Sequence, residues 1–526
     1  MSFPSIGISA CADALIQLST LPGAEILSLT ASPVLNHTQT VSSLVNPNHP
    51  TVQAKGVDFC NVTITYTHPG QGDEVGVETW LPLSTWNGRI QSVGGGGWVA
   101  GRFFLSYDGM TGAIAEGYVT SSTDAGLRDK QGSTASTPKD WAMVSEGNAN
   151  LYALQNLGTV SLHDQAILIK ALTKSFYGQE HMYAYWSGCS QGGRQGLSLA
   201  QNYPNDYDGI AAASPGIFLT QIFGSTLWGH VLMQNGGEFP HGCEFDRIHE
   251  AVIAECDRLD GLVDGLVSDE AACQFDPLTL VGQSFYCSDT GRTTVVSQVA
   301  AKLSAAVWAG PRSSRDEFLW FGPNMDARLA GNAPVGSPDS QHGLAQTACR
   351  DGTCEAMPVG LGDMWFPLFV QRNSSTDWKD YTPETYAKLF EKGVREFDGL
   401  IGTSNPDLSD FSNTGGKMIT YHGTADEIIP FKQMKHYYDQ VLRRDPDARD
   451  FYRLFEVPGL AHCAGGNGGQ PTAVWDALVA WVEKGEAPDT LPIYIKNDFV
   501  EEERLLRPYP QKPYSSNCGG RNATIA

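Results

Sequence analysis

Short apolar strands alternate with amphipathic helices at both ends of this chain, and that alternation limits its possible folds more than any other feature. In the first 220 residues, the pattern predicts strands at 75–81, 89–93, 117–122 and 182–186 and a helix at 163–176. Beyond residue 412 it predicts strands at 417–421 and 451–457 and helices at 431–443 and 471–483. Because alternating strands and helices build a sheet with helices packed on its faces, we expect an α/β protein.

The stretch between these two parts has a different texture. Residues 220–411 hold six of the eleven cysteines, many prolines and glycines, and large aromatic residues such as Trp320, Trp365 and Trp378. No repeat or low-complexity tract marks the chain. We therefore interpret residues 1–219 and 412–526 as one catalytic domain and residues 220–411 as a second domain inserted into it.

The charge balance restricts the possible partners. The 526 residues include 35 Lys and Arg against 58 Asp and Glu, a net charge of −23 with neutral histidine. A nucleic-acid partner requires a basic face, and an anionic membrane surface repels an acidic protein. No apolar run approaches the roughly 18 residues of a membrane span. We expect neither nucleic acid nor a membrane as a partner.

Cysteines and glycosylation sequons indicate the compartment. No pair of cysteines has C-x-x-C spacing, so the sequence does not suggest a zinc ribbon or a thioredoxin-like site. Four N-x-[ST] sequons begin at Asn36, Asn61, Asn373 and Asn522. Together these features favour a secreted, oxidised glycoprotein over a cytosolic protein with scattered thiols. Because the start lacks a basic and apolar leader, we read the numbering as that of a mature chain with an added initiator methionine.

A candidate nucleophile lies at the end of a short aromatic strand. Gly188-Cys189-Ser190-Gln191-Gly192 fits the pattern G-x-S-x-G, the sharp turn that exposes a serine hydroxyl above a sheet. The bare pattern is weak, but here a strand precedes it and a helix-forming run follows it. A side chain at either glycine would collide with the neighbouring strand or helix. Ser190 is therefore the predicted nucleophile.

A serine nucleophile needs a histidine base and a carboxylate that orients the base. In the order serine, acid, histidine, Asp426 follows the strand predicted at 417–421, and His462 lies on a glycine-flanked loop after the next strand. His422 is the nearest alternative, and its place at a strand end favours a packed residue. If Ser190 and His462 form a hydrogen bond, Cys189 and Cys463 must lie close together, and an oxidising compartment would bridge them.

These residues resemble the tannase/feruloyl esterase family, whose mark is a Cys-Ser, Asp and His-Cys arrangement with a disulfide between the neighbours of serine and histidine. The resemblance spans nearly the whole chain and implies an α/β-hydrolase core with a large inserted lid domain. It also suggests that the glycine run 94–97 is the oxyanion loop. Backbone N–H groups of Gly95 or Gly96, together with that of Gln191, are the expected donors.

An acidic loop follows in the predicted insertion. Residues 256–266 place three carboxylates three and four residues apart between glycines, a pattern that fits either an ordinary surface turn or calcium. The family resemblance implies structural calcium, with a Cys256–Cys273 bridge stapling the loop. Its expected ligands are the carboxylates of Asp257, Asp260 and Asp264 and the carbonyl groups of Leu262 and Leu266.

The resemblance leaves part of the cysteine pairing open. Cys11–Cys60 is similar to the family's N-terminal bridge, whereas the usual C-terminal pair has only Cys518 here, our candidate for the unpaired thiol. Four cysteines remain without an assigned partner: Cys243, Cys287, Cys349 and Cys354. Of these, Cys349 and Cys354 are close enough in sequence to close a short loop.

The expected activity is that of a secreted serine carboxylesterase working through an acyl-enzyme. Its expected substrate is a small phenolic ester or a feruloylated oligosaccharide, with feruloyl favoured over galloyl esters (a tannase) and over other aryl or aliphatic esters. The aromatic residues of 220–411 are expected either to form a stacking pocket or to pack the core of that domain. An inactive hydrolase fold used for adhesion is the alternative of another class.

Overall fold

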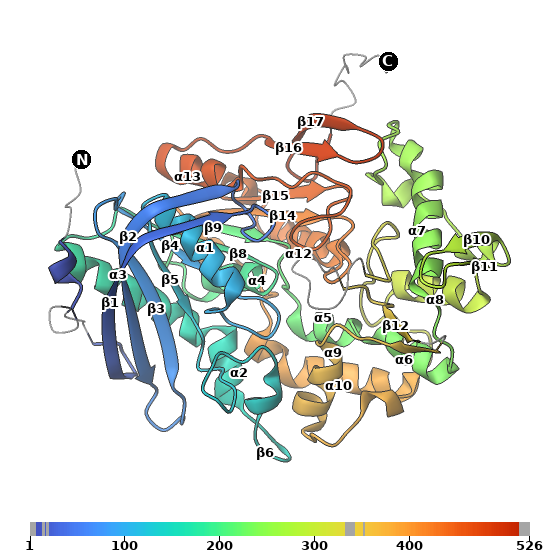
Figure 1. The fold of residues 1–526 in the computed structure, drawn as a ribbon, viewed down its shortest axis with the longest axis horizontal. Coiled ribbons are helices and arrows are strands. Elements are labelled where there is room, and N and C mark those ends of the chain that lie inside the picture. Colours follow the sequence, from blue (N-terminus) through green and yellow to red (C-terminus); the bar gives the residue numbers. More distant parts are fainter. Residues whose placement is uncertain (1–6, 13–15, 17–19, 332–341, 351–352, 515–526) are drawn as a thin grey trace.

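Nine strands form one mixed sheet at the centre of the computed structural model, which describes residues 7–12, 16, 20–331, 342–350 and 353–514 (Figure 1). Their order across the sheet is β1-β2-β3-β5-β4-β8-β9-β14-β15. The strands are β1 (Glu25–Val41), β2 (Val52–Thr67), β3 (Val75–Pro82), β4 (Arg89–Val93), β5 (Val119–Thr123), β8 (Tyr183–Cys189), β9 (Gly209–Ala213), β14 (Lys417–Gly423) and β15 (Tyr452–Val457). Strands β5 to β15 pair in parallel, and β1, β2 and β3 pair antiparallel at one side. The expected α/β class is confirmed.

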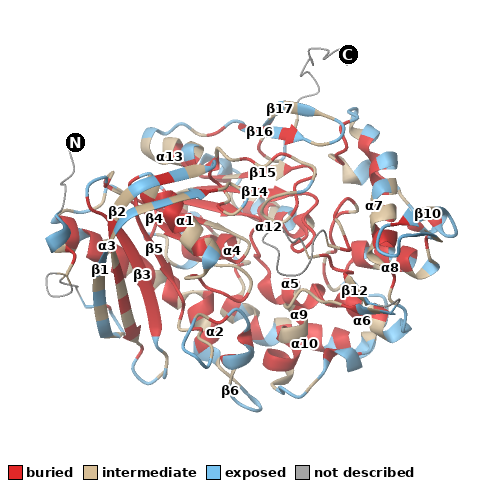
Figure 2. Ribbon diagram, viewed as in Figure 1, coloured by how far each residue is buried: buried red, intermediate tan, exposed pale blue. Residues whose placement is uncertain are grey.

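Helices cover both faces of the parallel part. They are α1 (Phe104–Ala115), α3 (Val160–Tyr177), α4 (Gln191–Asn202), α12 (Phe431–Arg444) and α13 (Val474–Lys484). Successive residues of a strand point to opposite faces. Accordingly Tyr185 of β8 joins the buried cluster of Trp475 from α13, whereas Trp186 joins the cluster of Leu197 from α4. Figure 2 shows these central strands as almost wholly buried.

The chain leaves the sheet after β9 and returns in the neighbouring strand β14. The intervening helices are α5 (Leu219–Ser225), α6 (Trp228–Gly236), α7 (Gly242–Cys256), α8 (Gln298–Ala309), α9 (Gly362–Trp365), α10 (Pro383–Ile401) and α11 (Ser409–Asn413). Two hairpins accompany them, β10 (Ser284–Cys287) with β11 (Arg292–Val295) and β12 (Thr347–Arg350) with β13 (Thr353–Ala356). Within the described residues, this segment adds no strand to the main sheet (Figure 1).

Smaller elements complete the fold. They are β6 (Met143–Ser145), β7 (Asn148–Ala149), α2 (Leu151–Gly158), β16 (Leu491–Lys496) and β17 (Glu501–Leu506). In the part of the chain that the structure describes, no helix combines the length and the apolar character that a membrane crossing requires.

The described residues contain five disulfide bonds, joining Cys11 to Cys60, Cys189 to Cys463, Cys243 to Cys287, Cys256 to Cys273 and Cys349 to Cys354. The three expected bridges are therefore present, and the pairing that the sequence left open is resolved. Cys518, the candidate for the unpaired thiol, lies outside the described residues.

Candidate active site

Ser190 occupies the sharp turn between β8 and α4, where its backbone adopts φ 60° and ψ −119°. This conformation is rare for a residue with a side chain and marks a strained position. The turn is tight: a Cβ atom on Gly188 would lie 2.5 Å from the carbonyl of Gly192. The local geometry thus explains the glycine at this position and presents Ser190 at the C-terminal end of β8.

Asp426 and His462 form a hydrogen-bonded pair beside this turn. The Nδ1 atom of His462 lies 2.8 Å from Oδ2 of Asp426. The other carboxylate oxygen accepts the backbone N–H groups of Ile428 and Ile429 at 3.0 and 2.7 Å. Burial opposes ionisation of Asp426, but the neighbouring histidines hold its pKa well below the ordinary range. Asp426 is therefore a fixed carboxylate that orients one nitrogen of His462 and leaves the other free to act.

His422 and Glu427 surround the pair. His422 is fully buried, with Nε2 2.9 Å from the carbonyl oxygen of Ile429 and 3.2 Å from Oδ2 of Asp426, consistent with a packed residue. The buried carboxyl of Glu427 accepts the backbone N–H of His462 at 3.1 Å. Burial and the charge of Asp426 raise the pKa of Glu427 to about 7. A second carboxyl group thus holds the histidine loop in place.

The disulfide between Cys189 and Cys463 joins the residue before Ser190 to the residue after His462. Their Cα atoms lie 5.9 Å apart, although 274 positions separate them in sequence. Because one bond links the two loops, the spacing between Ser190 and His462 cannot change freely.

The glycine loop after β4 packs directly on the serine turn. The N–H of Gly95 donates to Oε1 of Gln195 at 3.0 Å, and the N–H of Gly96 donates to the carbonyl of Val99 at 3.0 Å. The two glycine N–H groups expected as donors are therefore already engaged, one with α4 and one with the residues that follow the glycine run. Among the described residues, the N–H groups of Gln191 and Gly97 have no such acceptor, and Gly97 takes a left-handed φ of 55°.

A cavity of about 600 Å³ opens at this point. Ser190, His462 and the glycine loop are among its lining residues. The rest of its wall is largely apolar, from Leu44, Val45, Pro47, Phe103, Phe104 and Leu105. Phe104 is 60% exposed, so its ring is available to a ligand.

The aromatic residues of the insertion do not line this cavity. All of its lining residues come from outside 220–411. Trp365 and Phe369 instead pack against the buried Trp98, with ring centroids 6.4 and 5.3 Å apart. The sequence left two roles open for these rings, a stacking pocket or core packing. The structure shows core packing, which joins the insertion to Trp98 beside the glycine loop.

The structure shows the surroundings of the oxygen atoms expected as ligands in the acidic loop. The carboxylate of Asp257 accepts the N–H groups of Asp264 and Gly265 at 3.0 and 3.1 Å, which curls the loop around it. Oδ2 of Asp260 is buried and has no hydrogen-bond partner among the residues that the structure describes. In the described part of the chain, the carbonyl groups of Leu262 and Leu266 accept no hydrogen bond. Asp264 is buried and pairs with Arg504, which supplies part of the compensating charge.

Comparison with known proteins places this geometry in a family. The protein-family model described as tannase and feruloyl esterase matches residues 60–523 of this chain. A probable feruloyl esterase of Arthroderma benhamiae is 39% identical over 91% of this chain and 85% of its own length. The chain belongs to the tannase and feruloyl esterase family.

Members of the family with solved structures share the whole fold. A tannin acyl hydrolase from Aspergillus niger matches with a TM-score of 0.84 and 27% identity, over 99% of this chain and 95% of its own. Feruloyl esterase B from Aspergillus oryzae matches with a TM-score of 0.75 and 26% identity, over 96% of each chain. As a member of the tannase and feruloyl esterase family, the protein is a carboxylic ester hydrolase.

Three features of the site were missed by the sequence analysis. Glu427 directly follows Asp426, and this adjacent acidic pair was a usable signal. Gln195 lies one helical turn beyond Gln191 and braces the glycine loop, but no motif marks it. Phe103 and Phe104 follow the glycine run, and their exposure could be known only from the fold.

Proposed function

We propose that this protein is a secreted serine esterase that hydrolyses feruloyl and related hydroxycinnamoyl esters of plant cell-wall polysaccharides through an acyl-enzyme. The observation that carries the proposal is the Asp426–His462 hydrogen bond at the end of the apolar cavity that also contains Ser190. The disulfide between the neighbours of serine and histidine supports the same pairing. Five disulfides and the glycosylation sequons support secretion.

In the proposed reaction, the hydroxyl oxygen of Ser190 attacks the ester carbonyl while His462 accepts its proton. The tetrahedral intermediate collapses when His462 returns that proton to the leaving alcohol, which leaves the acyl group on Ser190. Water then attacks the acyl-enzyme, again with His462 as the base, and releases the acid and free serine. Asp426 stabilises the imidazolium in both steps and remains ionised.

The intermediate carries a negative oxygen that needs donors. We assign this role to the N–H groups of Gln191 and Gly97, because those of Gly95 and Gly96 already donate to Gln195 and to Val99. Gly95 and Gly96 then shape the loop rather than contact the substrate.

The apolar wall favours hydroxycinnamoyl over galloyl groups. A feruloyl group carries one phenol hydroxyl and a methoxy group, whereas a galloyl group carries three hydroxyls that need polar partners. Burial of a hydroxyl without a hydrogen bond costs about 1–3 kcal/mol. Tannase activity is the alternative, because the tannin acyl hydrolase from Aspergillus niger shares the fold along nearly the whole chain.

We also propose roles for the main sheet, for residues 220–411 and for the acidic loop. The nine-stranded sheet serves as an α/β-hydrolase core, and residues 220–411 serve as its lid domain. Calcium at the acidic loop would be held by Asp257, Asp260, Asp264 and the carbonyl groups of Leu262 and Leu266, and its role would be structural. It would neutralise the carboxylates and stiffen the loop that the Cys256–Cys273 disulfide closes.

The experiment that tests the proposal compares kcat/KM for methyl ferulate, methyl caffeate and methyl gallate. We expect the highest value for ferulate or caffeate. Phe104→Ala should lower it several-fold for methyl ferulate and little for a small acetyl ester, with the exposed Phe318→Ala as the matched control. A clear preference for methyl gallate would transfer the assignment to tannase.

A further inference from the structure

A second cavity, of about 310 Å³, lies among the loops at one edge of the main sheet. It is bounded by the loop after β2, the loop after β5 and the first turns of α2. Its polar lining residues are Gln71, Asp73, Glu74, Arg128, Asn150 and Asn156, and two aromatic residues, Trp141 and Tyr152, complete it. No residue of this cavity belongs to the active site described above.

The cavity and Ser190 share one edge of the sheet. Strands β4, β5 and β8 are parallel neighbours, so their C-terminal ends meet at the edge where Ser190 lies. Strand β2 ends at that edge too, because β2, β3 and β5 pair antiparallel in turn. Two strand spacings, about 10 Å, separate β5 from β8. The second cavity therefore lies at the same edge of the sheet as Ser190.

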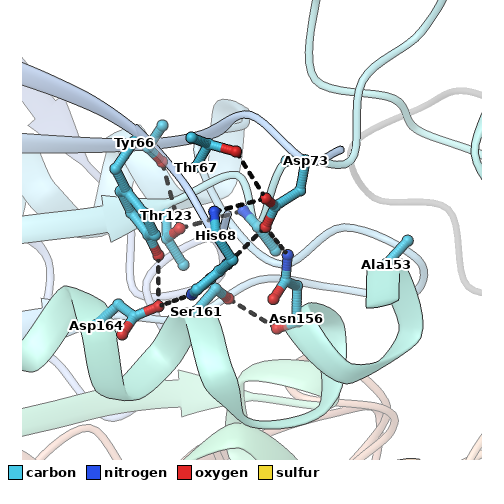
Figure 3. A network of polar contacts seen from close by, with 12 residues as sticks. Tyr66, Thr67, His68, Asp73, Thr123, Ala153, Asn156, Ser161 and Asp164 are labelled. Atoms are coloured by element: carbon cyan, nitrogen blue, oxygen red, sulfur yellow. Dashed lines mark hydrogen bonds and ion pairs between the residues drawn. The ribbon is translucent and has the colours of Figure 1, made fainter. Parts of the chain in front are cut away.

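A network of hydrogen bonds holds two of the lining residues, Asp73 and Asn156 (Figure 3). Asp73 accepts the backbone N–H of His68 at 2.8 Å and lies 2.6 Å from Nδ1 of its ring. The same carboxylate accepts a hydrogen bond from Nδ2 of Asn156 at 2.9 Å. The other ring nitrogen of His68 lies 3.2 Å from Asp164. The side chain of Asn156 is thereby fixed in one orientation.

Two buried polar groups of the lining are left without partners. Asn156 is 1% exposed and Trp141 is 5% exposed, and among the described residues neither the acceptor Oδ1 of Asn156 nor the donor Nε1 of Trp141 has a hydrogen-bond partner. Buried polar groups in proteins are normally paired, so each needs an explanation. A cation satisfies only the acceptor and an anion only the donor, whereas hydroxyl groups satisfy both kinds.

The remaining lining also fits a neutral ligand. Arg128 is paired with Glu74 at 3.4 Å and with Asp124 at 3.3 Å, so its charge is compensated within the protein. The ring of Tyr152 is 47% exposed at the cavity and offers a flat surface for the apolar face of a sugar ring. The amide of Gln71 is half-buried and makes no side-chain hydrogen bond within the described part of the chain.

We infer that this cavity binds a sugar unit in the alcohol part of the ester substrate. The inference rests on the proposed function, in which the alcohol is a cell-wall oligosaccharide, and it identifies where that oligosaccharide is held. Sugar hydroxyls pair with Asn156 and Trp141, and the sugar ring packs on Tyr152.

The test compares a substrate that has sugar units with one that has none. For Tyr152→Ala and for Gln71→Ala, the ratio of kcat/KM on a feruloylated arabinoxylo-oligosaccharide to kcat/KM on methyl ferulate should fall about five- to tenfold. Tyr286→Ala, a 70% exposed tyrosine on β10, is the matched control and should leave the ratio unchanged. Both variants change side chains that are at least partly exposed, so folding should persist.

A direct binding measurement separates this inference from the proposed function. Titration of xylotetraose into full-length Ser190→Ala should show binding that weakens in Ser190→Ala/Tyr152→Ala. Unchanged ratios in both variants, absence of xylotetraose binding, or preferential binding of gallic or ferulic acid at Tyr152 would each overturn the sugar assignment. Failure of the wild-type enzyme to cleave methyl ferulate would instead refute the proposed function, because sugar binding to Ser190→Ala does not depend on turnover.

Discussion

Glu427 is the residue with the greatest expected influence on the basicity of His462 after Asp426. Burial lowers the pKa of His462, but Asp426 and then Glu427 raise it, and the net shift is upward from its ordinary value of about 6.5. His462 must be neutral to act as a base, so kcat/KM should rise with pH through a midpoint above about 6.5. Ionisation of Glu427 near pH 7 adds negative charge that favours the imidazolium.

Glu427→Gln should therefore move the acidic limb of the pH profile for kcat/KM to lower pH, by about one unit or less. The side-chain oxygen of glutamine can still accept the hydrogen bond from the backbone N–H of His462, so the histidine loop should keep its position. The measurement is kcat/KM for methyl ferulate between pH 5 and 9, with thermal melting as the folding control. A limb that stays in place or moves to higher pH would refute the electrostatic role of Glu427.

At this scale a motif and the order of elements were sufficient to predict that Asp426 pairs with His462 and that His462 and Ser190 line one cavity. The donors of the glycine loop could not be predicted. Whether a backbone N–H is free depends on partners such as Oε1 of Gln195, 100 positions away, and this pairing exists only in the folded chain.

Among the elements, the serine turn and the histidine loop depend on the Cys189–Cys463 disulfide. Cys189→Ala/Cys463→Ala should lower kcat about tenfold or more at a temperature where the protein is still folded, because the two loops lose their fixed spacing. Cys11→Ala/Cys60→Ala is the matched control: it opens a distant loop of 49 residues and should cost stability but not kcat. Circular dichroism monitors folding in both variants. Wild-type kcat in the first variant would contradict this role.

Five of the six parallel strands were predicted, because most of their residues are buried on both faces and read as short apolar runs, whereas β9 (Gly209–Ala213) was missed. The prediction missed β1 and β2, the long antiparallel pair at the sheet edge. Most of β1 is exposed or half-buried and β-bulges interrupt its register, so neither an apolar run nor a strict alternation marks it. Edge position, which decides this pattern, is a property of the sheet and not of the segment.

For the whole molecule, the acidic loop links the insertion to the C-terminal hairpin through the pair of Asp264 with Arg504. If calcium occupies the loop, a chelator should lower the melting temperature by at least about 3 °C, and added calcium should restore it. The pH profile of the calcium-free enzyme should match that of the untreated enzyme at a temperature where both are folded, because the ion has no part in the reaction. A melting temperature indifferent to both chelator and calcium would remove the site.

The change of texture along the chain made it predictable that the described residues between β9 and β14 add no strand to the main sheet. The surfaces that face the substrate were not, because they are assembled from distant segments. The apolar wall of the large cavity joins residues 44–47 to residues 103–105, and the second cavity joins the ends of β2 and β5 to α2.

The central claim is that Ser190 forms the acyl-enzyme, and the turnover of Ser190→Ala tests it most directly. Its kcat for methyl ferulate should fall at least about 10³-fold while its melting temperature stays close to that of the wild type, because the change removes one partly exposed oxygen. Hydrolysis of methyl ferulate by folded Ser190→Ala at a rate near that of the wild-type enzyme would contradict the account.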